Sequence, residues 1–312
     1  MKDLLMQRGN QDPKSRTSPE LNPPAGRNKE CPINKLPPEV LIILFHIALE
    51  SLPPGTRYSK ALRALRVVSV RWSSLIDQAA TLWARSSCLD PEKAVKMALR
   101  KSAGALLRVA CVCGVTEERY DYAALVLPHS RRWSSLEAGT AKARTIVTLL
   151  SGQLPNLRSL TVLSPPNGAG PQSLQLDPTT YQLRYLTIRY CSISGFQFAF
   201  PYLRGLDLIG LSPQGPSVDQ VITVLAACAD SLECLGLAQS VIRPHPRQFC
   251  PENRVSLPKL RYLAMGGING ASVTQILASM DLPNSVSAFG PRYGPGYPRI
   301  TDCRPCRSAS PK

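Results

Sequence analysis

The sequence predicts an α+β or α/β solenoid, in which a bundle of three short helices is followed by a series of strand-and-helix repeats. Three observations lead to this prediction. Residues 40–49 carry nine apolar side chains and one histidine. A pattern of the form L-x-x-L-x-apolar recurs five times, at spacings of 26, 20, 29 and 28 residues. Helical patterns occupy several of the intervals between these recurrences.

The chain opens with a polar segment. Residues 1–32 contain Pro, Gly, Asn and charged side chains without apolar periodicity, which predicts a disordered arm. The arm lacks the apolar stretch of a secretory signal, and no later stretch has transmembrane length. We therefore expect the protein in the cytoplasm or the nucleus. Thiols stay reduced in these compartments, so most of the ten cysteines are expected as buried hydrophobes that need no disulfides.

The first predicted helix begins near Pro37 and Pro38 and runs to about Glu50. Proline is tolerated in a first helical turn, and Glu39 complements the positive end of the helix dipole. The apolar residues at 40–49 surround the helix on every side, so the helix must be buried all round. It is shorter than the roughly 20 residues that cross a bilayer. Its neighbours are therefore expected to be protein.

A second apolar pattern follows after an interruption at 51–59. Apolar and aromatic residues recur there at helical spacing, at Val68, Trp72, Leu75, Ile76, Ala79 and Trp83. Three short helices can thus be placed between residues 36 and 86. Together they hold more apolar surface than such a bundle can bury. The surplus requires a partner, which is either the rest of the chain or another protein.

The segments LPPEVLIILF, LRVVSVRWSSLI and ATLWARS together resemble the F-box, the adaptor-binding module of Skp/cullin/F-box ubiquitin ligases. The resemblance covers residues 33–88. It implies a three-helix domain that binds a Skp-type adaptor and, through it, a cullin. The adaptor-binding residues that it implies are Leu36, Pro37, Glu39, Leu41, Phe45, Val67, Trp72, Ile76 and Trp83.

The chain departs from the usual F-box pattern at two places. The link SLPPGTRYSKA after the first helix is longer than the usual turn, as in the F-box-like variants of mushroom-forming (basidiomycete) fungi. Ser69 stands where a cysteine is frequent. The alternative interpretation of residues 33–88 is an ordinary helical cap on the following domain, since an all-apolar helix can also be buried by its own chain.

The repeats that follow have the period of leucine-rich repeats. The five strong copies are residues 157–162, 183–188, 203–208, 232–237 and 260–265, and two weaker copies are residues 106–111 and 133–138. The best match is LRYLTIRYCSI, in which Cys191 takes the Asn/Cys position and Ile193 the next apolar one. Helical patterns lie at 91–102, 140–150, 217–229 and 272–280. Residues 89–290 are therefore predicted to form an irregular leucine-rich-repeat horseshoe, and residues 291–312 a flexible basic tail.

One edge of this predicted horseshoe is a candidate target site. Side chains alternate along a strand, so the third, fifth and seventh places of each repeat point away from the core. These places hold Tyr185, Arg189, Asp207 and Tyr262. The second place is arginine in four of the five strong copies, at Arg158, Arg184, Arg204 and Arg261. Stacked repeats would align them as a basic ladder that favours an acidic target, unless they only keep the repeat edge solvated.

Metal, cofactor and catalytic sites have weaker support. Cys303 with Cys306, and Cys111 with Cys113, could in principle supply four zinc ligands. The Gly-rich loop at 266–270 joins a strand to a helix but lacks a P-loop lysine. The histidines at 46, 129 and 245 belong to no catalytic motif. We therefore expect no metal, no cofactor and no enzymatic activity, with an unrecognised active site as the minor alternative.

The expected function is that of a substrate receptor. The helical module would bind the adaptor of a Skp/cullin/F-box ubiquitin ligase, and the repeats would bind a protein target whose identity the sequence does not reveal. The alternative is a leucine-rich interaction scaffold without a ligase link. Nucleic acid is disfavoured as a partner although the net charge is +16, because aromatic residues make up only 6% of the chain. No membrane partner is expected.

Overall fold

The computed structural model describes residues 31–52, 56–113, 121–140, 154–163, 182–190, 200–211, 215–244 and 254–289. The chain divides into two compact units, Met1–Leu41 and Ile42–Lys312. Residues 1–30 of the predicted arm and the predicted tail lie outside the described residues.

Helices precede the sheet at the places where the sequence predicted them. They are η2 Pro32–Lys35, α1 Pro38–Glu50, α2 Tyr58–Arg66, α3 Val70–Gln78 and η3 Ala80–Trp83. Glu39 lies in the first turn of α1, where the helix dipole favours a carboxylate. Ser69 caps α3, because its hydroxyl oxygen accepts a hydrogen bond from the backbone N–H of Trp72 at 3.1 Å.

Aromatic packing and charge pairs connect the helices of the second unit. The rings of Phe45 and Trp72 lie 4.8 Å apart between centroids, at an angle of 58°. The indole N–H of Trp83 donates to the carbonyl oxygen of Ile76 at 2.8 Å. Asp77 in α3 accepts hydrogen bonds from Arg66 of α2 and from Lys101, at 2.8 and 2.6 Å.

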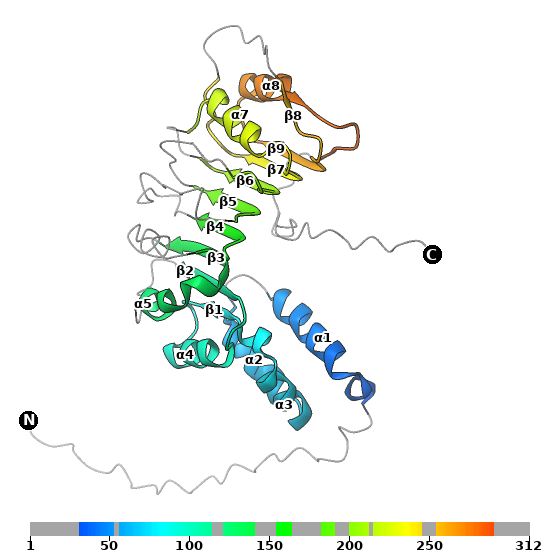
Figure 1. Ribbon diagram of the computed structural model, residues 1–312, viewed down its shortest axis with the longest axis vertical. Coiled ribbons are helices and arrows are strands. Elements are labelled where there is room, and N and C mark those ends of the chain that lie inside the picture. Colours follow the sequence, from blue (N-terminus) through cyan, green and yellow to red (C-terminus); the bar gives the residue numbers. More distant parts are fainter. Residues whose placement is uncertain are drawn as a thin grey trace, which may run out of the picture. The chain divides into compact units, whose positions relative to one another are not determined.

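Nine of the described strands form one parallel sheet, in which the strands follow one another in chain order (Figure 1). They are β1 Arg85–Ser87, β2 Leu107–Cys113, β3 Trp133–Thr140, β4 Ser159–Leu163, β5 Tyr185–Arg189, β6 Gly205–Ile209, β7 Cys234–Ala238, β9 Tyr262–Gly266 and β11 Ser287–Phe289. The short strands β8 Val255–Ser256 and β10 Met280–Asp281 form a separate parallel pair. Each of the seven sequence repeats overlaps one strand of the large sheet.

Two rows of apolar side chains on one face of the sheet form the core. The strand register aligns Leu136, Leu160, Leu186, Leu206 and Leu235 in the first row, and Ala138, Val162, Ile188, Leu208 and Leu237 in the second. All ten residues are buried. A fully buried leucine side chain contributes about 1.5–3 kcal/mol, so the period-2 alternation of each strand determines which face packs inward.

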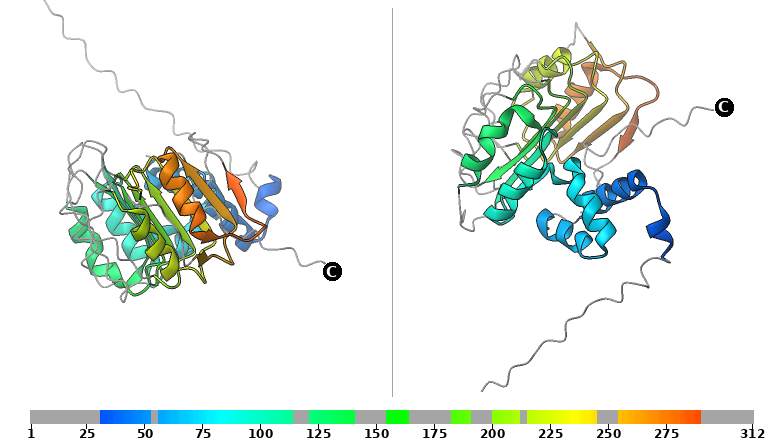
Figure 2. Two further views of the ribbon diagram at one scale, coloured as in Figure 1. Left: turned by 90° about the horizontal axis from the view of Figure 1, so that it is seen from above. Right: turned by 60° about the horizontal axis from the view of Figure 1, so that its bottom comes forward.

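The helices that follow the first strand contribute to the same core. They are α4 Glu92–Lys101, α5 Tyr122–Val126, η4 Leu127–Arg132, α7 Val218–Ala227 and α8 Gly270–Ala278. Val95, Val126, Val221 and Ile276 join the leucine rows in one cluster. Figure 2 shows α7 beside α8. Three of the four predicted helical patterns thus contain a helix, and the pattern at 140–150 lies, after its first residue, outside the described part of the chain.

Four consecutive strands of the sheet end in the same backbone turn. Tyr190, Gly210, Gln239 and Gly267 directly follow β5, β6, β7 and β9, and all four have positive φ angles, of 57°, 62°, 47° and 64°. The backbone N–H groups of Tyr190, Gly210 and Gln239 each donate to the last residue of the next strand. This repeated left-handed position turns the chain out of the sheet, and in two of the four turns it is not occupied by glycine.

The structure corrects the predicted fold class. The fold is α/β, built on one parallel sheet, and not a three-helix F-box followed by an irregular leucine-rich-repeat horseshoe. The sheet begins at β1, because the backbone of Arg85–Ser87 pairs with β2 instead of closing a helical bundle. Residues 42–88 therefore belong to the same compact unit as the sheet.

The cysteines differ in state. Cys111, Cys228 and Cys234 are buried, as expected for small core residues. Burial raises the pKa of Cys228 to about 12, so this thiol stays protonated. Cys88, in contrast, is disulfide-bonded, so the prediction that the cysteines need no disulfides is wrong for this residue.

Candidate functional site

The aromatic residues predicted to bind an adaptor lie in the core. Leu41, Phe45, Trp72, Ile76 and Trp83 are at most 9% exposed. Of the other predicted adaptor residues, Pro37, Glu39 and Val67 are exposed and Leu36 is half-buried. The aromatic residues that carry the sequence resemblance thus stabilise the helices, and they offer little surface to a partner.

A different set of side chains forms an exposed apolar surface. Ile43, Leu44 and Ile47 in α1 are 58, 37 and 57% exposed, and their spacing places them on one face of the helix. Val67, Val68 and Val70, at the turn between α2 and α3, are 76, 47 and 89% exposed. We call these six residues the apolar face. The apolar surplus was visible in the sequence, but composition alone does not separate the exposed side of α1 from its buried side.

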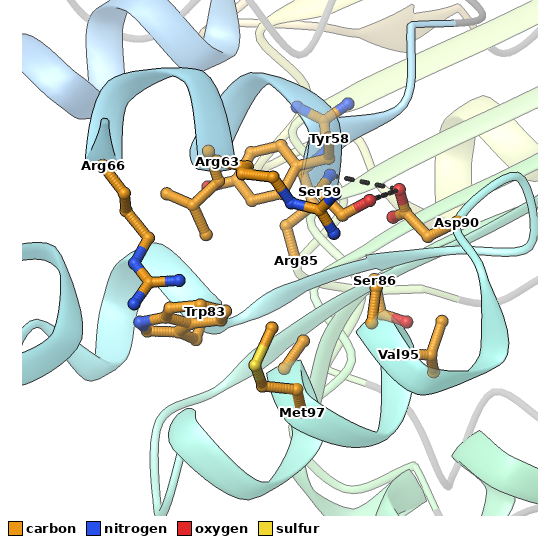
Figure 3. Close-up of a pocket in the computed structure, with 13 residues that line it drawn as sticks. Tyr58, Ser59, Arg63, Arg66, Trp83, Arg85, Ser86, Asp90, Val95 and Met97 are labelled. Atoms are coloured by element: carbon orange, nitrogen blue, oxygen red, sulfur yellow. Dashed lines mark hydrogen bonds between the residues drawn. The ribbon is translucent and has the colours of Figure 1, made fainter. Parts of the chain in front are cut away.

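A small pocket lies between α2, β1 and α4 (Figure 3). The indole ring of Trp83 lies 5.7 Å from the guanidinium carbon of Arg66 and 4.6 Å from the ammonium nitrogen of Lys101. The Ser59 hydroxyl donates to Asp90 at 2.6 Å, as Figure 3 shows. The cavity measures about 30 Å³, and Arg66 in its lining is paired with Asp77 at 2.8 Å. The residues that line this pocket connect the helices to the sheet, and the pocket has little room for a ligand.

A larger cavity, of about 400 Å³, opens where β1 and β2 begin. Leu49, Ala84, Ala105 and Leu106 supply apolar lining, and Ser134 lies at its margin. The polar lining includes His46, Glu50, Arg85 and Arg108. Arg108 pairs with Glu50 at 2.8 Å, and the imidazole of His46 is hydrogen-bonded to the Thr81 hydroxyl at 3.0 Å. No sequence signal pointed to this cavity, because its walls come from five separate stretches of chain.

The arginines of the predicted basic ladder lie at one edge of the sheet, where β7 separates Arg204 from Arg261. Arg158, Arg184, Arg204 and Arg261 each directly precede a strand of the sheet. Arg158, Arg184 and Arg261 are exposed, and the side chain of Arg204 is 43% exposed. The structure thus brings together four residues that are separated by up to 103 positions in the sequence, 261 − 158.

The predicted target residues within the strands are less accessible. Asp207 is 8% exposed and lies 3.5 Å from a guanidinium nitrogen of Arg189. Burial raises the pKa of Asp207, and Arg189 only partly offsets this effect. Tyr185 is half-buried, and burial also raises the pKa of its hydroxyl. Among the predicted strand residues, Tyr262 is the most exposed, at 41%. Asp207 and Arg189 are therefore better described as a partly buried ion pair.

The described residues hold no cluster of metal-ligand side chains. Within them, no group of three or more His, Cys, Asp or Glu side chains could hold a metal ion. Cys303 and Cys306 lie outside the described residues, as does the side chain of Cys113. The loop at 266–270 is described, and Gly267 at its centre packs against the backbone of Gln239. No described helix is long and apolar enough to cross a membrane.

Comparison with known proteins gives no further assignment. No family model matches the chain, and no curated protein matches it.

Proposed function

We propose that the chain is the substrate-receptor subunit of a Skp/cullin/F-box ubiquitin ligase in the cytoplasm or nucleus. Its N-terminal helices bind the adaptor, and its sheet binds a protein target. The observation that carries this proposal is the exposure of the apolar face, above all of Ile43, Leu44 and Ile47 on one side of α1, since exposed apolar patches mark interaction surfaces. The face lies within the segment that resembles the F-box.

A receptor of this kind needs no catalytic residue of its own. It holds a target lysine near a charged ubiquitin carrier and so raises the effective concentration of one reactant at the other. The described residues, which combine an apolar face on the helices with a basic edge on the sheet, provide two separate binding surfaces. This arrangement is what a bridging subunit requires.

The buried aromatic residues refine the proposal. Phe45 and Trp72 hold α1 against α3 through their ring contact, so their part in adaptor binding is to position the helices. Direct contact falls to the exposed side chains of the apolar face. An interaction scaffold without a ligase link is the second candidate. The burial of Phe45, Trp72, Ile76 and Trp83 favours it, because the residues that resemble the F-box are then accounted for by packing within this chain, without an adaptor.

Adaptor capture by purified protein tests the proposal. Ile43→Ser, Leu44→Ser and Ile47→Ser are combined in one variant, and the control variant carries Tyr202→Ser, Val241→Ser and Leu277→Ser. The control residues are 40 to 67% exposed, similar to the 37 to 58% of the α1 residues, but lie elsewhere. Each interface hot spot contributes about 2 kcal/mol or more, so the first variant should bind a Skp-type adaptor at least about 30-fold more weakly.

The expected result is loss of capture by the α1 variant and full capture by the control, with unchanged circular dichroism for both. Undiminished adaptor binding by the folded α1 variant would contradict the proposed contact. Failure of the unmodified chain to capture any Skp-type adaptor would favour the scaffold instead.

A further inference from the structure

The N-terminal edge of the sheet forms a continuous row of polar backbone neighbours. The N–H of Arg184 donates to the carbonyl oxygen of Arg158 at 2.8 Å, and the N–H of Arg204 donates to that of Arg184 at 2.7 Å. The row continues through Glu233 to Arg261, with hydrogen bonds of 2.7 and 2.8 Å. We call these five residues the edge row. Their order along the sheet is thus determined by direct backbone hydrogen bonds.

The spacing of the edge row suits an extended chain. Adjacent strands lie about 4.8 Å apart, so the row from Arg158 to Arg261 spans roughly 19 Å. An extended peptide advances about 3.3 Å per residue, so about six residues cover this distance. The long arginine side chains can adjust to carboxylates at alternate positions of such a peptide.

The edge row carries excess positive charge. It contains four arginines and one glutamate, and Glu233 lies 3.5 Å from Arg204. Within the described part of the chain, the guanidinium groups of Arg158, Arg184 and Arg261 form no ion pair. Exposed arginines on neighbouring strands repel one another, and an anionic partner relieves this repulsion.

The larger cavity lies at one end of the edge row. The N–H of Arg158 donates to the carbonyl oxygen of Ser134 at 2.9 Å, and Ser134 lines that cavity. Its apolar wall of Leu49 and Leu106 can accept an aliphatic side chain, and Arg85 adds a positive charge to its lining, whereas Arg108 is paired with Glu50. A bound segment can therefore place its charged part on the row and one apolar residue in the cavity.

We propose that the edge row and the cavity together bind an extended acidic segment of a partner protein, anchored by one aliphatic side chain. This assigns a target class to the proposed receptor and rests on that function for its biological role, although the binding itself needs only this chain. A peptide is favoured over nucleic acid, because Tyr185 is half-buried and Tyr262 is 41% exposed, which leaves little surface for base stacking.

The test measures fluorescence anisotropy of a labelled peptide with one leucine followed by six glutamates. One comparison peptide replaces the glutamates with glutamine, a second replaces the leucine with serine, and a single-stranded RNA octamer is the third probe. The edge-row variant carries Arg158→Gln, Arg184→Gln, Arg204→Gln and Arg261→Gln. A control variant removes the same number of charges elsewhere, through Arg57→Gln, Arg71→Gln, Arg100→Gln and Arg254→Gln.

Surface charge pairs are individually weak, so four of them together predict about 10- to 30-fold weaker binding by the edge-row variant at low salt. The control variant should bind the peptide at most about twofold more weakly than the unmodified protein. Added salt should reduce the peptide affinity of the unmodified protein far more than that of the edge-row variant. The glutamine peptide should bind the unmodified protein about as weakly as the glutamate peptide binds the edge-row variant. The serine peptide should bind several-fold more weakly than the leucine peptide.

Equal losses in the two variants would overturn the proposal, since net charge alone would then explain the binding. Equal binding of the leucine and serine peptides would remove the cavity from the site. RNA binding that is tighter than peptide binding and depends on the edge row would assign the row to nucleic acid. Adaptor capture is measured on the same proteins. If the chain binds the acidic peptide through the edge row but captures no adaptor, the peptide site is supported and the proposed ligase function is contradicted.

Discussion

At the scale of single residues, Asp77 connects three parts of the second unit. Its carboxylate accepts hydrogen bonds from Arg66 in α2 and from Lys101 at the end of α4, and both cations also lie against the ring of Trp83. Burial by itself would raise the pKa of Asp77. The hydrogen bonds and charges of Lys101 and Arg66 outweigh this effect and hold the pKa below its ordinary value of 3.8.

Asp77→Asn should lower the free energy of unfolding by about 1–2 kcal/mol at pH 7, since two partly exposed charge pairs are lost. Because the pKa of Asp77 is lower in the folded than in the unfolded protein, its ionised carboxylate stabilises the fold above pH 3.8. This stabilisation is lost as the pH falls through the pKa of Asp77 in the folded protein. The difference between variant and parent should therefore shrink in acid. Urea denaturation across a pH series measures it. Asp230→Asn, at an exposed aspartate, serves as control and should match the parent throughout.

At the scale of the elements, the ends of the strands depend on a backbone geometry that glycine adopts most easily. Gly210 has φ +62°, and a Cβ atom at this position would lie 2.4 Å from Cδ1 of Tyr190. Tyr190 itself has a positive φ of 57°. The ring of Tyr190, in the turn after β5, therefore occupies the space beside Gly210, in the turn after β6, that a side chain at position 210 would need.

Gly210→Ala should destabilise the protein by about 2–4 kcal/mol, as the sum of the left-handed backbone cost and the clash with the ring. In a Tyr190→Ala background the ring is absent, so only the backbone cost of about 1–2 kcal/mol should remain. A double-mutant cycle of chemical denaturation gives the coupling energy. Additive effects would show that the ring moves aside freely. Gly270→Ala, where an added Cβ meets no atom within 4 Å, should not destabilise and is the matched control.

At the scale of the whole molecule, residues 42–312 form one compact unit that includes helices and sheet. Ala84, directly after Trp83, belongs to the sheet core, and the Asp77–Lys101 pair joins α3 to α4. Helices α2 and α3 are therefore expected to unfold together with the strands, and not as an independent module.

Urea denaturation should show this cooperativity. Trp72 and Trp83 report on the helices, whereas Trp133 lies in β3. In a Trp133→Phe variant the tryptophan fluorescence reports only on the helical residues, and its midpoint should coincide with that of far-ultraviolet circular dichroism. A fluorescence transition at clearly lower urea would mean that the helices unfold first. A Trp72→Phe and Trp83→Phe variant, which reports on β3 alone, completes the comparison.

The sequence by itself located the repeating elements. Helices α1 and α3 and seven strands lie where apolar periodicity predicted them, because a side chain's alternation along a strand or helix is a local property. Helix α2, in contrast, begins at Tyr58, inside the predicted interruption at 51–59. The arginines of the edge row were also identified in advance, since equal places in a repeat become neighbours once the strands align.

Tertiary structure decided the fold class and the accessible surface. Whether Arg85–Ser87 ends a helical bundle or begins the sheet depends on its pairing with β2, which is a long-range contact that no local pattern encodes. In the same way, Phe45 and Ile47 are equally apolar in the sequence, yet Phe45 is 2% exposed and Ile47 57%. Burial depends on which other elements cover a side chain, so only the assembled structure separates residues that stabilise the protein from residues that can bind a partner.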